Sequence, residues 1–170
     1  MDISNGKGIG VALFVQGCHF HCKNCFNSDT WDFSGGKEWT KETKENFLSL
    51  MNKPQIKRVS ILGGEPLAEE NLDSVLDLVN ETRLIFPEKT IWLYSGYIWE
   101  EIFDATEGIT TQNLNVNRLI RQQIIKQCDI MIDGKFIDSQ KDLSLKWRGS
   151  KNQRCISIDK SLKMNTVVEL

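Results

Sequence analysis

Three cysteines and two histidines stand within the eleven residues GCHFHCKNCFN, from Gly17 to Asn27. The cysteines, Cys18, Cys22 and Cys25, have the spacing C-x3-C-x2-C. A cubane iron–sulfur cluster normally takes four cysteine thiolates. Three thiolates from one compact loop would leave one iron without a protein ligand, and a substrate could bind there. The spacing therefore favours an iron–sulfur centre with an open coordination position.

Three other interpretations of this segment remain open on the spacing alone. His19 or His21 could complete a structural zinc site, although such sites usually pair two separated groups of ligands. The three cysteines could also share one face of a helix and belong to the core, but the glycine and polar residues around them disfavour this. A redox dithiol of Cys22 and Cys25 is a third possibility, which leaves Cys18 without a role.

A second candidate site is the sequence Gly-Gly-Glu-Pro at residues 63–66. Gly63 and Gly64 would allow a ligand to approach the backbone closely, because they carry no side chain. Glu65 adds an acceptor for a cationic group such as an α-ammonium. The alternative is an ordinary turn from a strand to a helix, with Pro66 near the helix start.

Both candidate sites follow short apolar runs that are typical of strands buried on two faces. Such runs cover residues 11–16, 58–62, 90–95 and 129–133. Helical patterns lie between them. Leu72, Val75, Leu76 and Val79 form one apolar stripe of a helix that ends before Pro87.

Two more helices are expected. One begins after Thr40, a favourable N-cap, and turns Phe47, Leu48 and Met51 inward. The other covers residues 117–127, after a polar loop at 108–116.

Strands that alternate with helices predict an α/β fold with a mostly parallel sheet. A full eight-fold barrel needs about 250 residues, so this chain of 170 residues can build only part of one, or an open sheet. In either case ligands bind at the carboxyl ends of the strands. We expect one domain, residues 1–170.

Composition excludes several classes of function. The net charge is −2, with both signs interspersed, so no nucleic-acid partner is expected. No apolar run approaches the roughly 18 residues of a membrane span, and the first residues do not have the pattern of a signal peptide. We therefore expect a cytoplasmic protein, in which clustered cysteines serve a metal or catalysis rather than disulfides.

Together the two motifs resemble those of the radical S-adenosylmethionine enzymes. Within that superfamily the resemblance to the activating proteins of anaerobic ribonucleotide reductase runs essentially from end to end. It is carried by DISNGKG, LFVQGC, CFNSDTWDFSGGK, ILGGEPL, IWLYSGY, IDGKFI and KDLSLKWRGSKNQR. The last of these is specific to that family. Lys7 and Gly10 depart from the family, which usually has Pro and Arg there.

The resemblance implies a partial (βα) barrel of the radical S-adenosylmethionine type and a set of site residues. Cys18, Cys22 and Cys25 would bind one [4Fe–4S] cluster, and S-adenosylmethionine would occupy the open iron. Gly63, Gly64 and Glu65 would receive the methionine ammonium. The remaining implied contacts to the cofactor are Asn24, Cys25 and Phe26 beside the cluster, and Ser95 and Tyr97 after the third strand; Tyr97 could equally be ordinary core.

The resemblance also implies an activity and partners. The enzyme would be a radical oxidoreductase that cleaves S-adenosylmethionine to methionine and a 5′-deoxyadenosyl radical. That radical would generate the glycyl radical on the catalytic subunit of anaerobic ribonucleotide reductase, with a one-electron donor such as flavodoxin or ferredoxin. The alternatives are activation of another glycyl-radical enzyme, such as pyruvate formate-lyase, or a non-catalytic zinc-binding module.

Three features outside the two motifs complete the expectations. The segment RGSKNQR, residues 148–154, is either a solvated basic loop or a lid or surface facing the reductase, with Arg148 and Lys151 as candidate docking residues. Cys128 is expected to be a buried small apolar residue. His19 and His21 are expected to face solvent.

Overall fold

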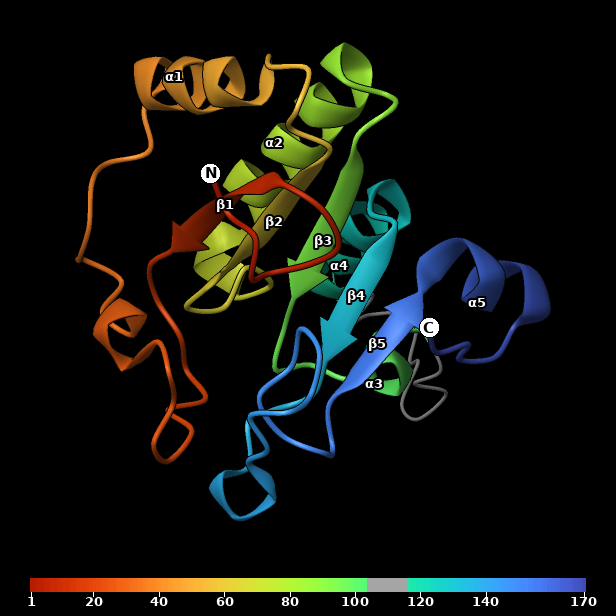
Figure 1. Cartoon of the computed structure of the whole chain (residues 1–170). Coiled ribbons are helices and arrows are strands. Elements are labelled where there is room, and N and C mark those ends of the chain that lie inside the picture. The colour runs from red at the N-terminus through yellow and green to blue at the C-terminus, as the bar shows by residue number, and fades with distance from the viewer. Residues whose placement is uncertain (104–115) are drawn as a thin grey trace.

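The computed structural model describes residues 1–103 and 116–170 and contains a five-stranded sheet flanked by helices (Figure 1). The strands lie in the order β1-β2-β3-β4-β5; the first four are parallel, and β5 is antiparallel to β4. Their bounds are β1 Gly10–Val15, β2 Arg58–Gly63, β3 Thr90–Tyr94, β4 Ile130–Asp133 and β5 Arg154–Ser157. The predicted α/β class and mostly parallel sheet are confirmed, and all four predicted strands are present.

The three predicted helices are also present. The helices are α1 Lys41–Met51, α2 Leu72–Ile85, α3 Trp99–Phe103, α4 Val116–Gln127 and α5 Ile158–Met164, with 3-10 turns η1 Ser28–Thr30, η2 Glu69–Asn71 and η3 Asp138–Gln140. Thr40 caps α1, because its side chain accepts a hydrogen bond from the Thr43 amide. Strand β5 and helices α3 and α5 were not predicted. The polar loop predicted for residues 108–116 lies outside the described residues, apart from Val116.

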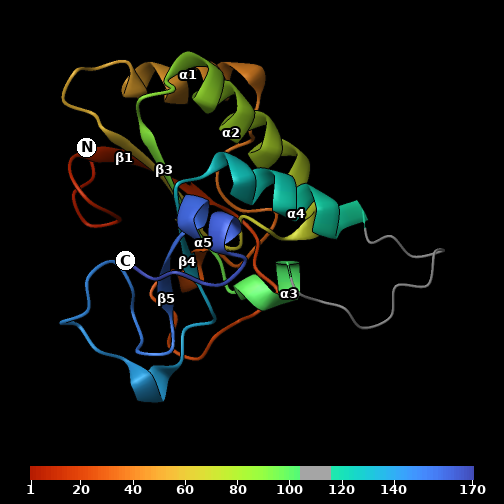
Figure 2. The same cartoon turned by 90° about the vertical axis from the view of Figure 1, so that its right-hand side faces the viewer.

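Helices α1, α2 and α4 lie together on one face of the sheet (Figure 2). Alternate strand residues point into this layer, where the core of the protein forms. The buried strand side chains include Val59, Ile61, Ile91, Leu93 and Met131. No helix in the described ranges is long and apolar enough to cross a membrane.

The other face of the sheet is covered near its amino end by the first residues of the chain. Arg58 of β2 is fully buried there, and its guanidinium donates to the Asp2 carboxylate at 2.6 Å and to the backbone carbonyl of Asn5 at 2.6 Å. A side chain at Gly10 would meet Arg58. Gly10, where the family usually has an arginine, therefore leaves room for the side chain of Arg58 from the neighbouring strand.

Candidate functional site

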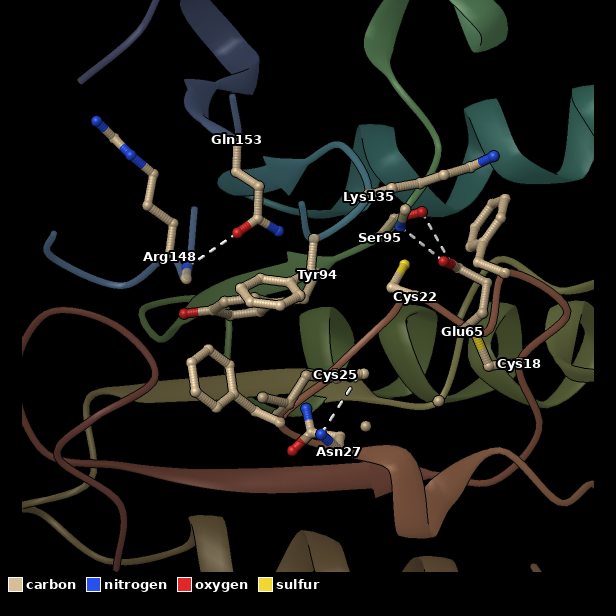
Figure 3. A pocket seen from close by; sticks show the side chains of 18 of the residues that line it. Cys18, Cys22, Cys25, Asn27, Glu65, Tyr94, Ser95, Lys135, Arg148 and Gln153 are labelled. Carbon is tan, nitrogen blue, oxygen red and sulfur yellow. Dashed lines mark hydrogen bonds between the residues drawn. The ribbon is translucent and has the colours of Figure 1, made fainter. Parts of the chain in front are cut away.

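The carboxyl ends of β1 to β4 surround a cavity of about 400 Å³, which is in the size range of small-molecule sites (Figure 3). Loops that follow three successive strands reach it. The first carries the three clustered cysteines, the second the two glycines with Glu65, and the third Ser95 and Gly96. The two candidate motifs therefore lie at the edge of the sheet that the sequence analysis predicted.

The cysteine loop is held in a non-helical shape by backbone hydrogen bonds to the segment behind it. The Gly17 amide donates to the Thr30 carbonyl at 2.8 Å, and the Cys18 amide donates to the Trp31 carbonyl at 3.1 Å. Gly17 has φ +92°, and a Cβ at this position would overlap the ring of Phe33. A single helix that buries all three cysteines, one of the alternatives above, is therefore wrong.

The Gly-Gly-Glu turn is bonded directly to the cysteine loop. The Gly64 amide donates to the Val15 carbonyl at 2.8 Å, and the Glu65 amide donates to the Gly17 carbonyl at 2.7 Å. Gly63 has φ +108°, where a Cβ would lie 2.8 Å from backbone atoms of β1. The two motifs form one rigid unit because their backbones are joined at the point where each strand ends.

Glu65 is a buried carboxylate with its two oxygens held by defined donors. One oxygen accepts from Ser95 Oγ at 2.8 Å and from the Leu67 amide at 2.8 Å, and the other accepts from the Gly96 amide at 2.7 Å. Burial raises the pKa of Glu65 to about 7, against the lowering effect of these bonds. A carboxylate has about four acceptor positions, so one position remains for a ligand that carries positive charge.

The three cysteine thiols reach one cavity, as the thiolate ligands of one cubane cluster must. Cys18 is buried, Cys22 and Cys25 are partly buried, and all three line the cavity. No three His, Cys, Asp or Glu side chains within the described ranges are placed to hold one metal ion. In a cubane each thiolate binds a different iron, so its ligands surround a larger volume than the ligands of one zinc ion.

Both histidines of the loop have partners other than the thiols. His19 Nε2 lies 2.9 Å from a Glu70 carboxylate oxygen, and His21 stacks on the ring of Trp31. Neither imidazole therefore supports the zinc alternative. Burial raises the pKa values of Cys18 and Cys22, so these thiols must lose protons as they bind a metal.

Not every predicted contact faces the cavity. Phe26 lines it, and so does Ser95. Asn24 is exposed and donates to Asp138 at 2.9 Å, outside the cavity lining. Tyr97 is also absent from the lining, because its ring packs between Phe20 and Arg121. Asn24 thus connects the cysteine loop to Asp138. Tyr97 packs against the core, which is the alternative that the sequence left open.

Several lining residues were missed. Tyr94, the last residue of β3, lies across the cavity from Cys18, and its hydroxyl has no hydrogen-bond partner among the described residues (Figure 3). The segment after β4 supplies more of the wall, including Phe136, Leu145 and Trp147. The position of Tyr94 at the end of a predicted strand was an available signal. The wall segment lies in two of the sequence motifs that carry the family resemblance, IDGKFI and KDLSLKWRGSKNQR, but its position against the cavity depends on the tertiary fold.

The chain is similar to known proteins over most of its length. The family model of the 4Fe-4S single cluster domain matches residues 4–156. The anaerobic ribonucleoside-triphosphate reductase-activating protein of Vibrio cholerae is 37% identical over 155 residues, which cover 90% of each chain. The protein of the same description from Escherichia coli K12 is 36% identical, with 90% of this chain and 91% of that protein covered. The protein of the same description from enterobacteria phage T4 is 36% identical, with 90% of this chain and 86% of that protein covered.

Proposed function

This chain belongs to the family of anaerobic ribonucleoside-triphosphate reductase-activating proteins, and from that premise we propose that it is a radical S-adenosylmethionine enzyme that generates the glycyl radical of that reductase. The observation that carries the proposal is the meeting of three cysteine thiols and a buried carboxylate in one cavity at the carboxyl edge of the sheet. When bound, the cluster and S-adenosylmethionine supply a one-electron cleavage that yields methionine and a 5′-deoxyadenosyl radical able to take hydrogen from glycine.

The residues of this chain bind and orient the two groups. Cys18, Cys22 and Cys25 hold one [4Fe–4S] cluster and leave one iron for the cofactor. Glu65 receives the methionine ammonium, since its carboxylate is fixed by Ser95 and the Gly96 amide and has an acceptor position left. The bound cation would also offset the cost of the buried negative charge.

The wall of the cavity excludes water from the reacting atoms. Phe26 packs against Phe136, with ring centroids 5.1 Å apart, and Trp147 packs edge to face on Trp92 behind the cavity. These contacts leave the cavity shielded on the side of β4 and open at its mouth.

The finer assignments follow the same proposal. The sheet is the incomplete (βα) barrel of the radical S-adenosylmethionine type, and residues 1–170 form one catalytic domain. The protein works in the cytoplasm, where reducing conditions keep its cysteines out of disulfides. A one-electron carrier such as flavodoxin or ferredoxin supplies the reducing electron.

The proposal is tested by anaerobic reconstitution with iron and sulfide. The wild type is expected to bind one cluster, to release 5′-deoxyadenosine with dithionite, and to produce a glycyl-radical EPR signal on the reductase. The Cys18→Ala protein should bind less iron and sulfide and release no 5′-deoxyadenosine. Cys128→Ala is the matched control, since Cys128 is buried behind the sheet and donates to Ile124.

Two outcomes would overturn it. A Cys18→Ala protein with full iron content and normal 5′-deoxyadenosine release would refute the cluster assignment. A glycyl radical that forms on pyruvate formate-lyase but not on the reductase would refute the assignment of the partner.

A further inference from the structure

The segment of residues 135–151, here called the rim segment, carries an excess of positive charge at the mouth of the cavity. The whole chain has a net charge of −2. The rim segment contains five basic residues against two aspartates: Lys135, Lys141, Lys146, Arg148 and Lys151, with Asp138 and Asp142. The sign of the charge on the rim segment is therefore opposite to that of the protein as a whole.

The rim segment has an ordered, projecting shape. Its base is closed by an antiparallel bridge between Lys141 and Ser150 and by the Lys151 amide, which donates to the Gln140 carbonyl at 3.0 Å. Farther out, the Asp142 amide donates to the Gly149 carbonyl at 3.1 Å. The backbone of the projection is thus held by its own hydrogen bonds, so its outer side chains are presented in a fixed arrangement.

The two sides of the rim segment differ in chemistry. Its inner side chains, Phe136, Leu145 and Trp147, line the cavity. Its outer side presents the exposed Lys141 and Lys146, with Leu143 between them 80% exposed. A single exposed leucine is ordinary on a protein surface. A leucine on a rigid projection between lysines has the composition of an interface, in which an apolar centre is surrounded by charge.

Lysines of the rim segment also lie over the cysteine loop. Lys135 Nζ is 4.6 Å from the ring centroid of Phe20, and Lys141 Nζ is 4.8 Å from that of Phe26. Cation–π contacts of this kind hold a positive charge in place without neutralising it. Phe26 is itself 55% exposed, so the positive and apolar surface continues from the rim segment onto the edge of the cavity.

We propose that the outer face of the rim segment is the docking surface for the reductase and that it binds acidic side chains flanking the glycine-bearing segment. This rests on the proposed function. The same segment lines the cavity with its inner side, so a partner held on its outer side is brought to the mouth of the site. A partner docked there would cover the cavity and keep water from a reactive radical.

Arg148 is not part of this surface, in contrast to the expectation from the sequence. Its side chain points away from the three cysteines (Figure 3), and its Nη1 lies 3.5 Å from the Cys155 sulfur. Lys151 is exposed but lies 3.7 Å from Asp142, which partly offsets its charge. Lys141 and Lys146 are therefore the residues to change.

The test compares the Lys141→Glu/Lys146→Glu protein with a Lys126→Glu/Lys160→Glu control. The control makes the same change in net charge with exposed lysines on α4 and α5. Affinity for the purified reductase is measured anaerobically by biolayer interferometry with S-adenosylmethionine present, at low and high salt. Rim charges govern association rate and its salt dependence, so we expect the rim variant to bind about tenfold more weakly at low salt. The control should bind like the wild type.

Parallel measurements separate this proposal from others. Equal thermal midpoints and equal 5′-deoxyadenosine release with dithionite, without reductase, establish that both variants retain fold and site. Unchanged affinity of the rim variant overturns the docking surface, and so does a defect confined to reduction by flavodoxin, which would assign the patch to the electron carrier. Absence of 5′-deoxyadenosine from the wild type would refute the proposed function, while the docking surface is judged on affinity alone.

Discussion

Replacing Gly64 by alanine should disrupt the joint between the two motifs. A Cβ at this position would overlap the Gly17 carbonyl oxygen and lie 2.8 Å from the Thr30 carbonyl oxygen. Both are backbone atoms of the cysteine loop, which cannot rotate away as a side chain can. The Gly17 carbonyl must move by roughly 1 Å to restore ordinary contact. The same carbonyl accepts a hydrogen bond from the Glu65 amide at 2.7 Å, so this movement would weaken that bond.

The expected loss of stability follows from these two effects. Overpacking of a tight interior costs about 1–3 kcal/mol, and the weakened hydrogen bond adds about 1 kcal/mol. For a domain of this size each kcal/mol lowers the melting temperature by about 2–4 °C, so the midpoint should fall by roughly 4–16 °C.

The assay is thermal denaturation of the metal-free protein, followed by iron analysis after reconstitution. Gly35→Ala is the matched control. Its Cβ would meet the end of the Gln16 side chain at 3.0 Å and the Asp32 carbonyl oxygen at 3.2 Å, which is a milder contact than at Gly64, and Gly35 has no positive φ. We expect the control to melt close to the wild type. A Gly64→Ala protein with the midpoint and iron content of the wild type would refute the claim that the two backbones are in tight contact here.

Two further predictions concern buried charges. Glu65 has an ordinary pKa of 4.5 and a pKa of about 7 in the folded protein, so between these values the folded protein keeps a proton that the unfolded chain has lost. The stabilisation from this bound proton is complete below pH 4.5 and disappears as the pH rises through about 7. Urea denaturation should therefore give a difference in free energy of unfolding between wild type and Glu65→Gln that changes across this range. A difference that does not depend on pH would contradict the prediction. Asp2→Ala should lower the free energy of unfolding by about 2–4 kcal/mol, below the 3–5 kcal/mol typical of a broken buried pair, because backbone carbonyls still accept from Arg58. An unchanged urea midpoint would show that those carbonyls suffice alone.

The sequence by itself determined the strands, the main helices and the location of the site. Apolar runs of five or six residues and the stripe from Leu72 to Val79 are local signals, because strand and helix periods repeat over neighbouring residues. Thr40 marked the start of α1 for the same reason. The cysteine spacing and the Gly-Gly-Glu turn each followed a predicted strand, and parallel strands place their carboxyl ends at one edge.

Only the tertiary structure decided what surrounds those motifs. Strand β5 reverses direction beside β4, and the rim segment folds back onto the cysteine loop, where Asn24 meets Asp138. Arg58 is buried because Asp2 and the first residues of the chain close over it. These contacts join residues far apart along the chain, so no local period encodes them. They form because buried polar groups must find partners once the sheet has brought the segments together.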